Sequence, residues 1–87
     1  MEKVKKQELP KWFEGELYQK GETVKNPYSG ESYELTAEEV SMYDFIKGAE
    51  MCMSMGMFCT PKIQKDFQKG LYWFRKTNPK AYMVLLD

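Results

Sequence analysis

Residues 36–61 read TAEEVSMYDFIKGAEMCMSMGMFCTP, and this stretch predicts the longest helix of the chain. Its first four residues form a capping box, because the Thr36 side chain can accept from the Glu39 amide while the Glu39 carboxylate returns to the Thr36 amide. Acidic residues in a first turn also suit the positive end of the helix dipole. We therefore expect a helix that begins at Ala37 and continues to about Phe58, just before the next proline.

The apolar residues of this predicted helix fall on two sides. At about 100° per residue, the core-facing stripe comprises Met42, Phe45, Ile46, Ala49, Cys52, Met53, Gly56 and Met57. Met51 and Met55 lie nearly opposite that stripe and are joined by Phe58. This second apolar side either packs beneath the following helix or contacts a second copy of the chain.

The alternating methionines of residues 51–57 also raise the question of a metal site. Thioether and thiolate sulfurs are soft donors that bind Cu(I), and MxMxM runs resemble those of copper-handling proteins. On a helix, however, these sulfurs point to different sides, whereas a strand would place all four methionines on one face. We therefore predict core or partner-binding surface here, with no metal site and no cofactor.

Before the capping box, residues 15–35 read GELYQKGETVKNPYSGESYEL, in which short runs rich in Tyr, Val and Thr are separated by two turn signals. This pattern predicts an antiparallel meander of three strands. The expected strands are Glu16–Tyr18, Glu22–Lys25 and Ser32–Leu35, with Leu17, Val24, Tyr33 and Leu35 facing inward. Strands this short need a covering helix to be stable.

After the capping box, Thr60-Pro61 supplies a cap and a proline at the first helical position. The second helix is expected from Pro61 to about Lys76. Its buried face comprises Ile63, Phe67, Leu71 and Phe74. Asn78-Pro79 repeats the same pattern and predicts a short C-terminal element, for which we favour a helix over a strand. The fold class is therefore α+β, in a single domain of residues 1–87 with residues 1–9 as a mobile tail.

The opposite face of the second helix is basic and aromatic. Its residues are Lys62, Lys65, Lys69, Tyr72, Trp73 and Lys76. Such a face can hold phosphates by charge and bases by stacking, as single-strand binders do. The simpler alternative is a solvated face on which Trp73 lies against lysine stems.

Composition limits the function classes. The chain has 87 residues and zero net charge, yet residues 12–59 carry three lysines and nine acids, while residues 60–87 carry six basic residues and two acids. Its two cysteines are expected to be buried thiols. There is no histidine, which removes the commonest general base and metal ligand. We predict no enzyme and no catalytic residues, and the lack of a signal peptide or membrane-length apolar run predicts a cytoplasmic protein.

Two segments of the chain read NPYSGESYELTAEEVSMYDFIKGAE and KGLYWFRKTNPKAYMVLLD. Both resemble small uncharacterised proteins of marine tailed phages, including cyanophages. Together they cover about half of the chain. The resemblance implies expression in a bacterial host cytoplasm and a helper or host-takeover role. It transfers no functional residue.

These observations predict a non-catalytic interaction protein that forms a homodimer and binds a host or phage protein, without a membrane. The candidate self-association residues are Met51, Met55, Phe58 and Trp12. The alternative is a nucleic-acid-binding module that uses the basic and aromatic face, through Lys62, Lys65, Lys69, Tyr72, Trp73 and Lys76. Steep weakening of binding with salt would indicate the alternative, because apolar interfaces respond little to ionic strength.

Overall fold

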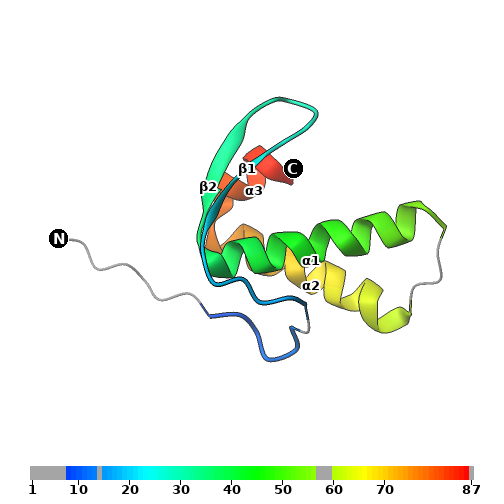
Figure 1. Cartoon of the computed structure of the whole chain (residues 1–87). Coiled ribbons are helices and arrows are strands. Elements are labelled where there is room, and N and C mark those ends of the chain that lie inside the picture. The colour runs from blue at the N-terminus through cyan, green and yellow to red at the C-terminus, as the bar shows by residue number, and fades with distance from the viewer. Residues whose placement is uncertain (1–7, 14, 57–59, 87) are drawn as a thin grey trace.

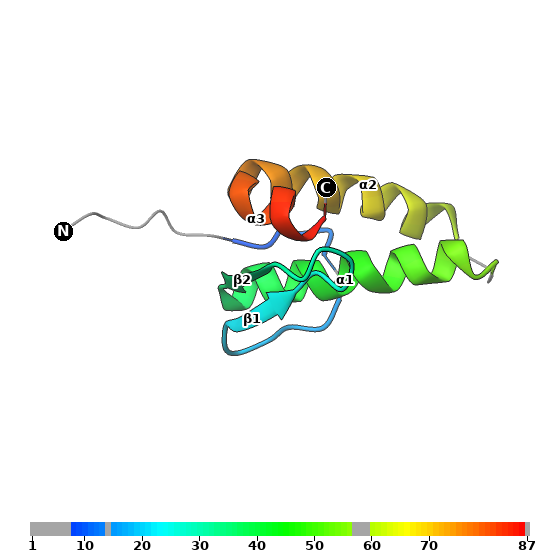
Figure 2. The ribbon, with the colours of Figure 1, turned by 90° about the horizontal axis from the view of Figure 1, so that it is seen from above.

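The computed structural model describes residues 8–13, 15–56 and 60–86 and has an α+β fold (Figure 1). In chain order the elements are β1 (Glu22–Lys25), β2 (Ser32–Leu35), α1 (Ala37–Ser54), α2 (Pro61–Thr77) and α3 (Pro79–Leu85). The helices α1 and α2 run antiparallel and lie side by side in both views (Figures 1 and 2). The hairpin and α3 lie at the end of this pair where α1 begins and α2 ends.

The capping box of α1 is confirmed. The Thr36 hydroxyl accepts from the Glu39 amide at 3.2 Å, and the Glu39 Oε1 accepts from the Thr36 amide at 2.9 Å. The other end differs from the prediction, since α1 ends at Ser54 rather than near Phe58. Gly56 has a φ of 71°, a left-handed conformation that glycine adopts readily and that commonly terminates helices. Phe58 itself lies outside the described residues.

The sheet has two strands among the described residues, paired antiparallel with Val24 opposite Tyr33. Both of these strands match the predicted bounds, but the predicted third strand at Glu16–Tyr18 is wrong. The amide of Tyr18 donates to the Ser41 hydroxyl at 2.9 Å, so this segment is tied to a side chain of α1 instead of to a strand. Leu17, predicted to face inward, is 64% exposed.

The turn between the strands is anchored to α3 by one side chain. The Asn26 Oδ1 accepts from the Tyr28 amide at 2.8 Å, while its Nδ2 donates to the Val84 carbonyl at 2.9 Å. An asparagine that bonds the backbone two residues ahead is a common means of stabilising a turn. The hairpin is therefore held against α3 as well as by its own ladder.

The core lies between the hairpin, α3 and the helix pair. Its buried members are Leu35, Val40, Met42, Ile46, Phe74, Ala81 and Leu85. The helices approach closely at Gly70 of α2, where an added Cβ would lie 3.1 Å from the Met42 sulfur and 3.3 Å from the Ile46 Cγ1. The predicted core role of Met42, Ile46 and Phe74 is confirmed.

The C-terminal element is a helix, as favoured from the sequence. Asn78 caps α3, with its Oδ1 accepting from the Ala81 amide at 3.2 Å. The same side chain donates its Nδ2 to the Oε2 of buried Glu39 at 3.0 Å. One amide therefore links the beginning of α1 to the junction of α2 and α3.

Three positions of α1 and its end depart from the predicted core stripe. Ser41, placed outside the stripe, is buried, and its hydroxyl donates to the Ala37 carbonyl at 2.9 Å. Gly56, placed within it, is exposed. Cys52 is partly buried and disulfide-bonded, so the expectation of a buried thiol is wrong there.

Leu9, within the predicted N-terminal tail, packs against the core, whereas residues 1–7 lie outside the described residues.

Candidate functional site

The main candidate site is an open hollow of about 510 Å³ between α2 and the N-terminal segment. Its lining residues are Pro10, Trp12, Gln68, Lys69, Tyr72, Trp73, Lys76 and Thr77. We call this hollow the aromatic–basic groove. It combines three aromatic side chains with two lysines, and these residue types can bind a ligand by stacking and by charge.

One side of the groove is formed by residues of α2 that helix periodicity brings onto the same face. Lys69, Tyr72, Trp73 and Lys76 occur at intervals of three, one and three residues along α2, which brings them onto one side of the helix. The helix forms there because Thr60 accepts from the Ile63 amide at 3.2 Å and because its opposite side is apolar. Tyr72 is 61% exposed.

The N-terminal segment, residues 8–13, forms the other side. The Trp73 indole N–H donates to the Glu8 carbonyl at 3.2 Å, which holds the start of the segment against α2. Trp12 packs its ring 6.2 Å from that of Phe45 on α1, and the Phe13 ring lies 5.8 Å from the same Phe45 ring. The segment is therefore fixed from both helices of the pair.

Both groove lysines lie over aromatic rings. The Lys69 ammonium is 5.8 Å from the centre of the Trp12 ring, and the Lys76 ammonium is 5.7 Å from the centre of the Tyr72 ring. These distances are within the range of cation–π attraction. The ion pairs recorded for the described residues are Lys47–Glu50 and Lys62–Asp66, so no carboxylate in residues 8–13, 15–56 or 60–86 forms a recorded ion pair with either groove lysine.

The structure brings together only part of the predicted basic and aromatic face. Lys69, Tyr72, Trp73 and Lys76 line the groove, whereas Lys62 and Lys65 lie outside it. Lys62 donates to the nearly buried Asp66 carboxylate at 2.7 Å. Trp12 and Pro10 were not predicted as groove residues, since nothing in the local pattern of residues 8–13 indicates packing against a helix about sixty residues away.

The predicted self-association surface is separate from this groove. Met51 and Met55 are 59% and 65% exposed on α1 and its C-terminal cap, and neither lines the groove. Trp12, proposed for the same surface, instead lies in the groove and is partly buried. Phe58 is outside the described residues.

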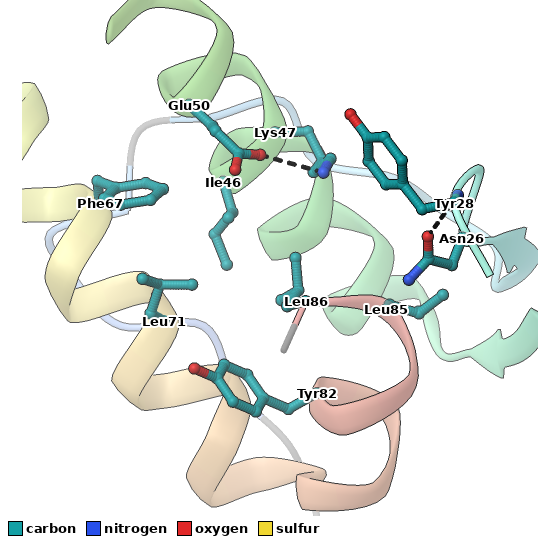
Figure 3. A pocket seen from close by; sticks show the side chains of 10 residues that line it. All are labelled: Asn26, Tyr28, Ile46, Lys47, Glu50, Phe67, Leu71, Tyr82, Leu85 and Leu86. Carbon is teal, nitrogen blue, oxygen red and sulfur yellow. Dashed lines mark hydrogen bonds and ion pairs between the residues drawn. The ribbon is translucent and has the colours of Figure 1, made fainter. Parts of the chain in front are cut away.

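A second hollow, of about 250 Å³, lies between the hairpin and the three helices (Figure 3). Its lining includes Ile46, Leu71 and Leu85, all of which also contribute to the core, together with polar side chains such as Asn26 and Tyr28. The Lys47 and Glu50 side chains pair with each other at 3.0 Å on its rim, as Figure 3 shows.

The phenol of Tyr18, which lies near α1, has a raised pKa. Burial raises the pKa of its phenol above the ordinary value of 10.0, and the negative charges of Asp44 and Glu16 raise it further. A hydrogen bond with the Asp44 carboxylate acts in the same direction. The phenol is therefore kept in its protonated form by its surroundings.

Residues 8–13, 15–56 and 60–86 contain no cluster of three or more Cys, Asp or Glu side chains that could hold a metal ion. In that part of the chain, no helix has the length and apolar character needed to cross a membrane.

Comparisons with protein-family models, curated proteins and solved structures find no match to this chain. The resemblance of residues 26–50 and 69–87 to phage proteins, and with it the binding of a host or phage protein, stays a prediction. Any functional proposal therefore rests on the site itself.

Proposed function

We propose that this chain is a small non-catalytic binding protein and that the aromatic–basic groove is its ligand-binding surface. The observation that carries the proposal is the convergence of Trp12, Tyr72 and Trp73, from two distant segments, around one open hollow. Tryptophan and tyrosine are enriched at binding hot spots, because they bury a large area with few rotatable bonds.

The surrounding charges support the same surface. Lys69 and Lys76 lie over aromatic rings and are exposed, so a negatively charged group can reach them from solvent. The polar side chains of the interior have other roles, since Glu39 and Asn78 join the helices and Asn26 anchors the hairpin. The groove thus combines accessible charge with accessible aromatic area.

The experiment uses the two tryptophans of the chain, both of which line the groove. Their fluorescence is followed while single-stranded DNA or polyglutamate is added. Binding of either probe, weakened in a variant that combines Tyr72→Ala with Lys76→Ala, supports the proposal. The matched control combines Tyr28→Ala with Lys80→Ala, two exposed residues outside the groove, and should bind as the unmodified protein does. Binding that is equal in both variants contradicts the proposal.

Self-association is a second candidate function, favoured by the exposure of Met51 and Met55. Exposed methionines form adaptable interaction surfaces, and closed twofold dimers are the commonest soluble oligomers. We expect a dimer by light scattering at high micromolar concentration, and a monomer when Met51→Glu and Met55→Glu are combined. Met83→Glu, at an equally exposed methionine on α3, is the control. A monomeric unmodified protein contradicts this candidate.

A further inference from the structure

We infer that the ligand of the aromatic–basic groove is single-stranded nucleic acid. The inference rests on the proposed function, since it names the ligand class of that same groove. Its basis is the pairing of aromatic faces with lysines, which matches the two parts of a nucleotide.

The groove contains two ring–cation pairs. Lys69 lies over Trp12 and Lys76 lies over Tyr72, with ammonium-to-ring distances of 5.8 and 5.7 Å. A nucleotide consists of a flat base and a phosphate joined by a sugar. Because each ammonium lies over one face of its ring, a base can stack on that face when the flexible lysine side chain moves aside to pair with the phosphate. Each pair therefore fits one nucleotide.

The two pairs are arranged along α2. Lys69 and Lys76 are seven residues apart, which corresponds to about 10 Å of helix. Trp73 lies between them in sequence and also lines the groove, which adds a third aromatic side chain. A strand that follows the helix would meet a lysine at each end and aromatic rings between them.

The aromatic component distinguishes single strands from other polyanions. In a duplex the bases are stacked inside the helix, so only phosphate contacts to Lys69 and Lys76 would remain. An acidic peptide can also pair with these lysines, but glutamate and aspartate side chains have no aromatic ring to stack on Tyr72 or the tryptophans. Stacking is tolerant of base identity, so we expect little sequence preference.

The test measures binding of a short fluorescent oligothymidylate by anisotropy, with circular dichroism to confirm that each variant folds. Tyr72→Ala should weaken binding by about five- to hundredfold, the usual loss for one stacked base. Tyr72→Phe retains the ring and should bind as the unmodified protein does. An unchanged affinity for Tyr72→Ala would overturn the inference.

The lysines are tested through the salt dependence between about 50 and 200 mM. Lys69→Ala and Lys76→Ala should each lower the slope of log affinity against log salt by about 0.7, the value for one phosphate contact on a single strand. Lys65→Ala makes the same change on an exposed position of α2 outside the groove and should leave the slope unchanged. A slope that responds equally to all three variants would count against the groove as the binding surface for the strand.

Two competitors separate failure of this inference from failure of the proposed function. A duplex of the same length should bind at least tenfold more weakly than the single strand, and a duplex that binds equally well overturns the inference. If polyglutamate binds in the groove and the oligothymidylate does not, the ligand class is wrong but the groove stays the binding surface. If neither probe binds, both proposals fail.

Discussion

At the residue scale, single polar side chains hold this small fold together at its junctions. Asn78 is the clearest case, because one amide caps α3 through its oxygen and donates to Glu39 through its nitrogen. Glu39 in turn completes the capping box of α1. Buried polar groups are stable only when they are hydrogen-bonded, so replacing such a residue has effects on several elements.

Asn78→Asp tests this link, since aspartate retains the capping oxygen but brings a second carboxylate against Glu39. We expect the free energy of unfolding to fall by about 2 kcal/mol or more, because the buried Glu39 carboxylate loses one of its donors and gains a repulsion. Urea unfolding measures the change. Adding Glu39→Gln should recover part of the loss, since the glutamine amide can donate to Asp. A double variant no more stable than Asn78→Asp alone would argue against the interaction.

Tyr18 predicts an alkaline loss of stability. Its pKa is raised in the folded protein, so above pH 10.0 the unfolded chain loses the phenol proton while the folded protein retains it. The contribution of Tyr18 is therefore fully present below pH 10.0 and is lost as the pH rises through the raised pKa. Between pH 9 and 11, the melting temperature should decrease less in Tyr18→Phe than in the unmodified protein. Identical decreases would show that this phenol has no such role.

At the element scale, the packing of α1 against α2 depends on a glycine at the contact. Gly70 lies where an added Cβ would press on Met42 and Ile46, both of which are completely buried. Gly48 of α1 is also in a helix interior, but an added Cβ there would meet nothing within 4 Å. Substitutions of the two glycines are therefore expected to have opposite effects on stability.

Gly70→Leu should lower the free energy of unfolding by about 1–3 kcal/mol, the usual cost of overpacking a core. Gly48→Ala should raise it by up to about 1 kcal/mol, because alanine has the higher helix propensity and no clash offsets the gain. Denaturant unfolding of both variants measures the difference. Equal effects at the two sites would contradict the close helix approach at Gly70.

At the scale of the whole molecule, cohesion comes from the apolar core and a few long-range hydrogen bonds. The recorded ion pairs of residues 8–13, 15–56 and 60–86 each lie within one helix, so they do not join the acidic first half to the basic second half. The hairpin, α2 and α3 instead meet around buried Leu35, Phe74 and Leu85. The C-terminal helix is therefore part of the core.

Leu85→Ala should destabilise the protein by about 2–5 kcal/mol, because it opens a cavity between α3 and the rest of the core. Met83→Ala shortens an exposed side chain of the same helix and should change stability by less than about 0.5 kcal/mol. Calorimetric unfolding distinguishes the two variants. If Leu85→Ala were as mild as Met83→Ala, α3 would not be docked as described.

Features that depend only on neighbouring residues could be predicted from the sequence alone. The caps at Thr36, Thr60 and Asn78 are local hydrogen bonds, and they predicted where all three helices begin. The turn signals at residues 19–21 and 26–30, with the runs between them, likewise predicted the bounds of both strands. The end of α1 was predicted too late, although Gly56 was a local signal for it.

What covers each apolar or aromatic face is known only from the packing of the folded chain. Periodicity shows that α2 has two kinds of face, but hydrophobic burial has no direction and does not specify a partner segment. Lys69 and Tyr72 were predicted to share a face, whereas their placement beside Trp12 depends on a contact about sixty residues away in sequence. Tyr18 is a second example, because it was predicted to lie in a strand, whereas its amide donates to the hydroxyl of the buried Ser41. The groove is therefore a product of packing between distant segments.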